Sequence, residues 1–127
     1  LIRLSDWTQC LPDYYTPVII TNETMINKRP DVLSKFLAAT AQGYQFAIDH
    51  PAEAAEILIK AAPEANPELV RKSQAWLSPR YRAEAPRWGE QKLSVWQGYA
   101  EWMANQGLLE KKIDAAKAFS NDFLPKP

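Results

Sequence analysis

The run Asp13–Thr21, which reads Asp-Tyr-Tyr-Thr-Pro-Val-Ile-Ile-Thr, limits the possible folds more than any other part of this chain. Val18–Ile20 favours the pleated backbone of a strand, and consecutive β-branched residues are typical of a strand buried on both faces. We therefore expect a strand over Tyr15–Thr21, with Leu1–Asp6 as a second, shorter candidate. A short extended segment that leads into helices is either a strand at a sheet edge or a hinge between two lobes.

The rest of the sequence is predicted to be helical, and prolines mark where its helices begin. Pro30, Pro51 and Pro67 each precede residues with helical spacing, and proline is well tolerated in a first helical turn. The expected helices are a short one from Asn22 or Thr24 to about Lys28, longer ones over 31–49, 52–62, 67–78 and 90–106, and a last short one over 114–119.

Each of the longer helices carries apolar residues at helical spacing, which we expect to face a core. These residues are Leu33, Phe36, Leu37, Thr40, Tyr44, Ala47, Ile48, then Ala54, Ala55, Leu58, Ile59, then Leu69, Val70, Ser73, Trp76 and Leu77. The helix over 90–106 has two apolar stripes, one with Trp96 and one with Tyr99 and Trp102, so we expect it to be covered on two sides. Gly107 is well placed to end it.

The composition argues against several classes of protein. The 127 residues suit one ordinary domain, and 15 basic and 15 acidic residues give no net charge. A nucleic-acid partner is not expected, because such binders carry a clustered basic face. No apolar run is long enough to span a membrane, and Leu1–Leu4 does not resemble a signal peptide.

The sequence offers little for catalysis or metal binding. Cys10 is the only cysteine and His50 the only histidine, which leaves no usual zinc site and no internal disulfide. His50 is expected at a helix boundary, before Pro51, although a ligand contact is the alternative. We expect no catalytic residue, no metal and no cofactor, and therefore no enzyme.

Several motifs in order suggest a family. They are Tyr-Tyr-Thr-Pro-Val-Ile-Ile at 14–20, Arg-Pro-Asp-Val-Leu-Ser-Lys-Phe-Leu-Ala-Ala-Thr at 29–40, His-Pro-Ala-Glu-Ala-Ala at 50–55, Trp-Gln-Gly-Tyr-Ala-Glu-Trp-Met at 96–103 and Asn-Asp-Phe-Leu-Pro at 121–125. Together they resemble the C-terminal portion of an ABC-transporter substrate-binding protein, from the branch that handles thiamine pyrimidine precursors, nitrate, sulfonates and taurine. The sequence begins with Leu1, so we expect a fragment or a processed product.

The resemblance implies an α/β, predominantly helical piece of a type II periplasmic-binding-protein fold, with one or two short crossing strands and about five helices. Residues 1–12 would be a remnant of the second lobe and the hinge, and residues 13–127 would complete the first lobe. The implied function is to capture a small molecule, such as a thiamine pyrimidine precursor or a sulfonate, between lobes and deliver it to an ABC permease. The implied location is periplasmic or extracytoplasmic.

The predicted ligand-binding residues are Asp13, Tyr14, Tyr15 and Thr16. A phenol offers an aromatic face and a polar tip, and Asp13 can accept from an amino group. The alternative is that a tyrosine packs in the core while Asp13 caps a turn. The related branch that synthesises the thiamine pyrimidine uses a cysteine-rich stretch here, and Leu11–Tyr15 contains no cysteine.

The tryptophans and the apolar surfaces leave an alternative function open. Trp76 and Trp96 are expected in the core, whereas Trp7 and Trp88 lie in irregular segments and are the candidates for a cleft or a partner surface. The alternative function is a helical oligomerisation or interaction module. It would form a homodimer through Tyr15–Thr21 or through the apolar helix faces.

Overall fold

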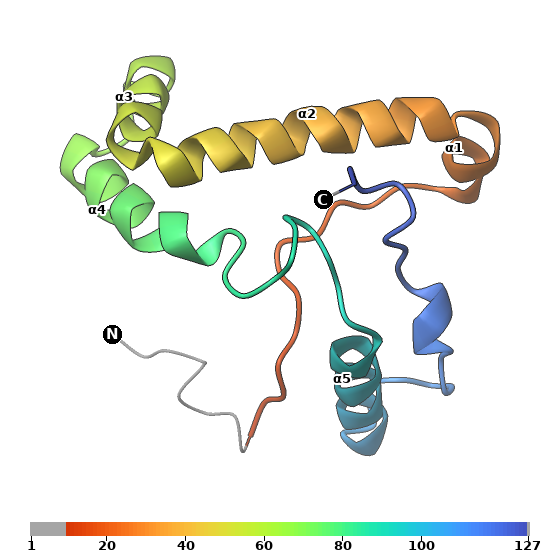
Figure 1. Ribbon diagram of the computed structural model, residues 1–127. Helices are drawn as coiled ribbons and strands as arrows, with labels where there is room; N and C mark the ends of the chain where they lie inside the picture. Colours follow the sequence, from red (N-terminus) through yellow and green to blue (C-terminus); the bar gives the residue numbers. More distant parts are fainter. Residues whose placement is uncertain (1–9, 127) are drawn as a thin grey trace. The chain divides into compact units, whose positions relative to one another are not determined.

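The computed structural model describes residues 10–126, and these residues form two packed units (Figure 1). We name them by their helices. The α5 unit comprises the described part of Leu1–Asn22 together with Gln91–Asp122. The α1–α4 unit comprises Glu23–Glu90 and the described part of Phe123–Pro127. The predicted strand over Leu1–Asp6 and the predicted site at Trp7 lie outside the described residues.

The α1–α4 unit is built from α1 (Glu23–Lys28), α2 (Pro30–Asp49), α3 (Pro51–Ala61), α4 (Pro67–Leu77) and the 3₁₀ turn η2 (Ser78–Arg80). These bounds confirm the predicted helices of this unit. Residues at the helix starts determine where the helices begin. Proline occupies the first position of α2, α3 and α4, and Asn66 caps α4 by accepting a hydrogen bond of 3.0 Å from the Leu69 N–H. As predicted, His50 lies between α2 and α3 as the cap residue of both.

Packing in the α1–α4 unit runs along the chain, with α1 against α2, α2 against α3, and α3 against α4. Ala55 of α3 is 1% exposed, because a small side chain lets α4 approach closely. Arg71 of α4 donates to both carboxylate oxygens of Glu56 on α3, at 2.6 and 3.2 Å. The predicted burial is wrong for several residues of the apolar stripes, since about half or more of the surface of each is exposed; they are Phe36, Leu58, Leu69 and Trp76.

The α5 unit is organised around α5 (Leu93–Asn105), with the short 3₁₀ turn η3 (Ala115–Lys117) packed against it. The helix starts later than the predicted Glu90, because the Gln91 and Lys92 backbone groups bond to side chains outside the helix. Gly107 ends it as predicted, with φ +70° and a 2.9 Å hydrogen bond from the Leu108 N–H to the Met103 carbonyl. The predicted helix over 114–119 is only the turn η3.

The predicted strand Tyr15–Thr21 is not formed. Within residues 10–126 there is no strand, and Thr16–Thr21 makes no hydrogen bond. The expected burial is also wrong for this segment, because Val18, Ile19 and Ile20 are 40%, 51% and 86% exposed. A strand exists only through hydrogen bonds to a neighbour, and no described residue supplies one. The helical character is therefore confirmed, while the type II binding-protein fold stays a prediction.

Candidate functional site

A column of three aromatic rings lies along α5 and includes the predicted ligand residue Tyr14. The Tyr14 ring stacks on Tyr99, with centroids 5.3 Å apart and planes 21° apart. Tyr99 in turn stacks on Trp102, at 5.7 Å and 17°. Within residues 10–126, Tyr14 and Trp102 each contact one ring, that of Tyr99, so these two partly exposed residues are the ends of the column.

The main chain beside Tyr14 is held to α5. The Trp102 indole N–H donates a 3.0 Å hydrogen bond to the Cys10 carbonyl. Asp13 is exposed, and its Oδ1 accepts from the Tyr14 N–H at 3.0 Å. The other carboxylate oxygen of Asp13 has no hydrogen bond within the described residues, so an amino group at the end of the column could bond to it. Thr16 is also exposed, next to this segment.

Tyr15 faces a second aromatic group and has a structural role. Its ring lies 6.3 Å from Trp96, which stacks almost parallel on Phe119 at 5.7 Å and 4°. Its phenol oxygen accepts a 2.8 Å hydrogen bond from the Lys92 N–H, one of the free donors at the start of α5. These contacts confirm that aromatic rings cover α5 on two sides, whereas Trp96 is only half-buried and does not lie in a closed core as predicted.

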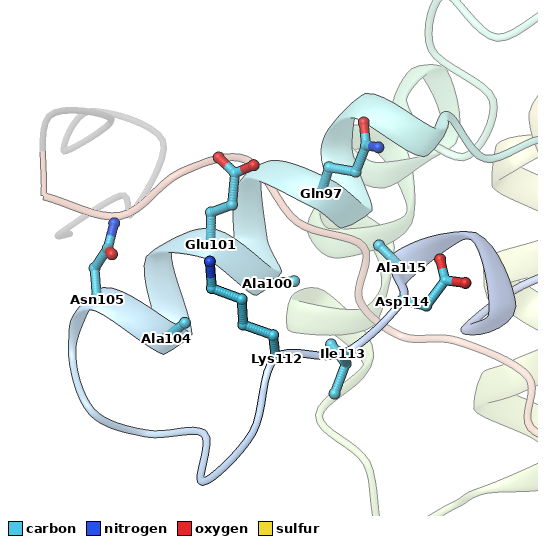
Figure 2. A pocket seen from close by; sticks show the side chains of 9 residues that line it. All are labelled: Gln97, Ala100, Glu101, Ala104, Asn105, Lys112, Ile113, Asp114 and Ala115. Carbon is cyan, nitrogen blue, oxygen red and sulfur yellow. The ribbon is translucent and has the colours of Figure 1, made fainter.

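A polar cleft opens on another part of α5, between the helix and residues 112–115 (Figure 2). It has a volume of about 490 Å³. Gln97, Glu101 and Asn105 line one wall and Lys112 the other, while alanines form the floor. Glu101 and Lys112 make no ion pair or hydrogen bond within the described residues. None of the four predicted ligand residues lines this cleft.

The α1–α4 unit has an aromatic cluster of its own. Tyr44 of α2 stacks on Trp88 at 4.7 Å and meets Tyr81 edge-on at 4.9 Å. An open groove of about 390 Å³ runs beside it, lined by Tyr44 and Tyr81 with Thr40, Gly43 and Ala47. Trp88, a predicted cleft or partner residue, is therefore half-buried against Tyr44. Trp76 is half exposed, with the Arg80 guanidinium 3.9 Å above its ring.

A polar network fixes Tyr81 and closes the end of α2. The Ala47 carbonyl, which is free of helical bonds near the end of α2, lies 3.0 Å from Ser78 Oγ and 3.3 Å from Gln74 Nε2. Ser78 is 3% exposed, and the Tyr81 hydroxyl donates to Gln74 Oε1 at 3.1 Å. Burial and the neighbouring Tyr44 raise the pKa of the Tyr81 phenol, so this network stays neutral at ordinary pH.

Neither a group of metal ligands nor a membrane-spanning helix is found among the described residues. Within residues 10–126, no three His, Cys, Asp or Glu side chains gather where they could share an ion. No helix in the same range is both long enough and apolar enough to cross a membrane. Cys10 is exposed and unpaired.

The contact of Tyr14 with α5 could not be predicted from the sequence. The sequence places Tyr99 and Trp102 on one apolar stripe, but the contact between Tyr99 and Tyr14 joins residues more than eighty positions apart. The stripe with Tyr99 and Trp102 was the one indication of this contact, because two aromatic side chains on one helix face favour packing against another aromatic ring. The contact of Lys92 with Tyr15 could not be predicted from residue type, since it is made by the backbone N–H of Lys92 and not by its side chain.

Comparison with known proteins identifies relatives of the chain. Residues 1–54 match the family model described as NMT1/THI5 like. The chain resembles the NMT1/THI5-like family. Over 115 residues it is 28% identical to a formylaminopyrimidine-binding protein of Halalkalibacterium halodurans, which covers 87% of this chain and 35% of the relative. Over 114 residues it is 27% identical to the riboflavin-binding protein RibY of Chloroflexus aurantiacus, covering 84% of this chain and 32% of the relative.

These matches confirm the resemblance predicted from the sequence, and they are consistent with a C-terminal fragment of an ABC substrate-binding protein. Both relatives are named as binding proteins for small molecules. The chain spans about a third of the length of each relative.

Proposed function

We propose that this chain is part of a solute-binding protein that captures a small, planar nitrogen heterocycle through the open end of the Tyr14–Tyr99–Trp102 column. The observation that carries the proposal is the partly exposed Tyr14 ring at the end of this column, beside the exposed Asp13 carboxylate. A heteroaromatic ring gains stacking energy on such a ring, and a ring amino group can donate to Asp13.

The two relatives favour this ligand class. A pyrimidine and riboflavin are both planar heterocycles with hydrogen-bonding edges, whereas a sulfonate or nitrate has no ring to stack. We therefore propose a pyrimidine-like ligand, such as a thiamine pyrimidine precursor, in preference to a sulfonate. In this proposal the segment Asp13–Thr16 forms one wall of the site, Tyr14 supplies the stacking face, and Thr16 is a further hydrogen-bonding group.

The proposed biological role is to bind this solute outside the cytoplasm and deliver it to an ABC permease. The chain is proposed to act without chemical conversion of the ligand, as the relatives' names as binding proteins suggest. The part played by the remaining two thirds of such a protein is to complete the cleft.

A fluorescence titration with riboflavin and with a formylaminopyrimidine tests the proposal. We expect both compounds to bind the chain, and Tyr14→Leu to weaken binding about tenfold through the lost stacking face. Asp13→Asn should weaken the aminopyrimidine and spare riboflavin, because riboflavin carries no exocyclic amino group. Trp76→Leu is the matched control, since it removes a half-exposed ring from the other unit. Equal affinities for the wild type and Tyr14→Leu would contradict the proposal, as would the absence of binding.

A second candidate function, homodimerisation, is favoured by the exposed run Val18–Ile20 in a segment without hydrogen bonds. Such a segment can pair with the same segment of another copy. Light scattering on the chain and on Ile20→Lys tests it. A concentration-dependent dimer that the lysine abolishes would support it, and a monomer at all concentrations would exclude it.

A further inference from the structure

The polar cleft between α5 and residues 112–115 lies within the α5 unit and takes no part in the proposed heterocycle site (Figure 2). Its volume of about 490 Å³ falls within the range of pockets that bind small molecules, which is roughly 300–1,000 Å³. None of the three rings of the aromatic column lines it. The cleft is therefore a separate feature of this unit, with a chemistry of its own.

Three polar side chains form one wall of the cleft, because they lie four residues apart along α5. Gln97, Glu101 and Asn105 therefore share one face of the helix (Figure 2). Ala100 and Ala104 lie in the floor beside them, and their short side chains leave room for a ligand. A helix holds side chains more precisely than a loop does, so this wall presents a carboxylate between two amides in a fixed arrangement.

The second wall is the segment that leads into η3, and this turn holds the segment against α5. Ala115 is 6% exposed where η3 packs on the helix. Asp114 stabilises the turn, since its Oδ1 accepts a 3.2 Å hydrogen bond from the Ala116 N–H. Its Oδ2 lies 3.8 Å from Lys117 Nζ. The Asp114 carboxylate is thus used within the turn, and Lys112 supplies the available charge of this wall.

Glu101 and Lys112 present opposite charges from opposite walls of the cleft. Within residues 10–126, neither makes an ion pair or a hydrogen bond, so their charged ends are too far apart to bond to each other. Both residues are exposed, so water surrounds each charge in place of a protein group. In the same range Gln97 and Asn105 make no side-chain hydrogen bond. The cleft therefore offers four polar side chains whose bonding groups a ligand can use.

We propose that this cleft is a second binding site, for a small zwitterion whose ammonium and carboxylate groups are separated by a short aliphatic chain. The ammonium group donates to the Glu101 carboxylate, the carboxylate group accepts from Lys112 Nζ, and the aliphatic chain lies over the alanines of the floor. A molecule with a single charge leaves the other charge of the cleft without a partner, so the site selects for both charges together. This inference does not depend on the proposed heterocycle site.

A chemical-shift titration of the ¹⁵N-labelled chain with three compounds tests the need for both charges. The compounds are 5-aminopentanoate, which carries both, and pentylamine and pentanoate, which carry one each. We expect 5-aminopentanoate to cause saturable shifts of the amide signals of 97–105 and 112–115, and each of the other compounds to bind about tenfold more weakly. Shifts centred elsewhere, the absence of saturation, or equal affinities for the three compounds would overturn the proposal.

Variants of the two charged residues test their roles in the same titration. Glu101→Gln and Lys112→Gln each remove one charge, and each should weaken the binding of 5-aminopentanoate about tenfold. The double variant Glu101→Lys with Lys112→Glu has both charges again, exchanged between the walls, and should bind with about the wild-type affinity and the ligand reversed. An affinity of the double variant as low as that of the single variants would mean that the charges do not act as a pair, and it would overturn the proposal.

Glu110→Gln and Lys111→Gln are the matched controls, because they remove the same kinds of charge at exposed positions of this unit that do not line the cleft. They should leave the affinity for 5-aminopentanoate unchanged. Equal losses in the control and cleft variants would show that only the net charge of the chain matters, and would overturn the proposal. All four positions are exposed, so we expect each variant to fold, and the dispersion of its ¹⁵N spectrum checks this.

Discussion

The two units reach their packing by different means. In the α5 unit, one helix is joined to irregular segments from both ends of the described chain by stacked rings, such as Tyr14 on Tyr99 and Trp96 on Phe119. In the α1–α4 unit, four consecutive helices pack in chain order, and a polar network around Ser78 closes the end of α2. Among residues 10–126, each unit has one buried apolar residue, Ala115 in the α5 unit and Ala55 in the α1–α4 unit, and neither of these is large.

This difference indicates where each unit is vulnerable. The α5 unit depends on a few aromatic contacts between residues far apart in sequence. The α1–α4 unit depends on helix signals that act locally, with side-chain hydrogen bonds added. A substitution in one unit should therefore leave the contacts of the other largely intact, and this can be measured.

The largest effect is expected for Tyr99→Ala. Tyr99 is the middle ring of the column, so the change removes two stacking contacts and leaves a void, at a cost of about 3 kcal/mol. Urea unfolding followed by near-ultraviolet circular dichroism measures the free energy. NMR spectra of the variant should show that α2–α4 keep their dispersed signals. Simultaneous loss of structure in both units would show that they are not separately packed.

A smaller loss is expected for Ser78→Ala. The hydroxyl is buried and lies within bonding distance of the Ala47 and Gln74 carbonyls, so its removal should cost about 1–2 kcal/mol. Ser73→Ala, at an exposed position of the preceding helix α4, serves as the control in the same urea experiment. Equal stability of the two variants would mean that the network does not hold the end of α2.

Alkaline titration should single out Tyr81. Burial and the nearby Tyr44 raise the pKa of this phenol, so the folded state favours the neutral form. Its contribution to stability is therefore complete below the ordinary tyrosine pKa and is lost as the pH rises through the folded value. In absorbance at 295 nm, Tyr81→Phe should remove a late-titrating component. If the removed component titrates at or below the ordinary range, burial does not control this group.

The smallest effect is expected at the surface pair of Glu56 and Arg71. Hydrogen bonds from Arg71 lower the pKa of Glu56, so any stabilisation is present above the ordinary glutamate pKa and is lost as the pH falls through the lowered value. Both side chains are more than half exposed, so water and salt screen the pair. Glu56→Gln should lower the melting temperature slightly at neutral pH and low salt, and not at all in 1 M salt. A large, salt-independent drop would contradict this.

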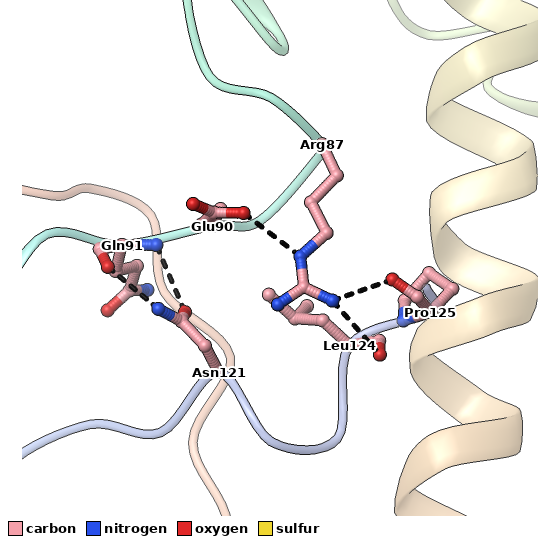
Figure 3. A network of polar contacts seen from close by, with 6 residues as sticks. All are labelled: Arg87, Glu90, Gln91, Asn121, Leu124 and Pro125. Atoms are coloured by element: carbon pink, nitrogen blue, oxygen red, sulfur yellow. Dashed lines mark hydrogen bonds and ion pairs between the residues drawn. The ribbon is translucent and has the colours of Figure 1, made fainter. Parts of the chain in front are cut away.

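The sequence predicted the α1–α4 unit better than the α5 unit for a physical reason. Pro30, Pro51 and the Asn66–Pro67 pair act within one helical turn, so helix starts follow from neighbouring residues. The strand prediction at Tyr15–Thr21 was wrong because pairing depends on a partner that no nearby residue reveals. Arg87 and Asn121 gave no signal, since Arg87 donates to the Pro125 carbonyl and Asn121 to the Gln91 carbonyl, each thirty or more positions away in the sequence (Figure 3).

Part of the candidate site could be predicted, and part could not. The sequence indicated Tyr14 as a ligand residue by its chemistry, and that role stays a prediction. Its stacking partners came only from the structure, because the two segments of the column are distant in sequence. Tyr15 has the same side chain as Tyr14, but its hydroxyl oxygen accepts a hydrogen bond from the Lys92 N–H at the start of α5. Residue type alone cannot show this difference.

The most direct test of the central claim is to map the chemical-shift changes that riboflavin causes in the ¹⁵N-labelled chain. We expect the largest changes at Asp13–Thr16 and around Tyr99 and Trp102, and no changes in α2–α4. Changes centred on the polar cleft at Glu101 and Lys112, or on the groove beside Tyr44 and Tyr81, would place the ligand elsewhere and contradict it.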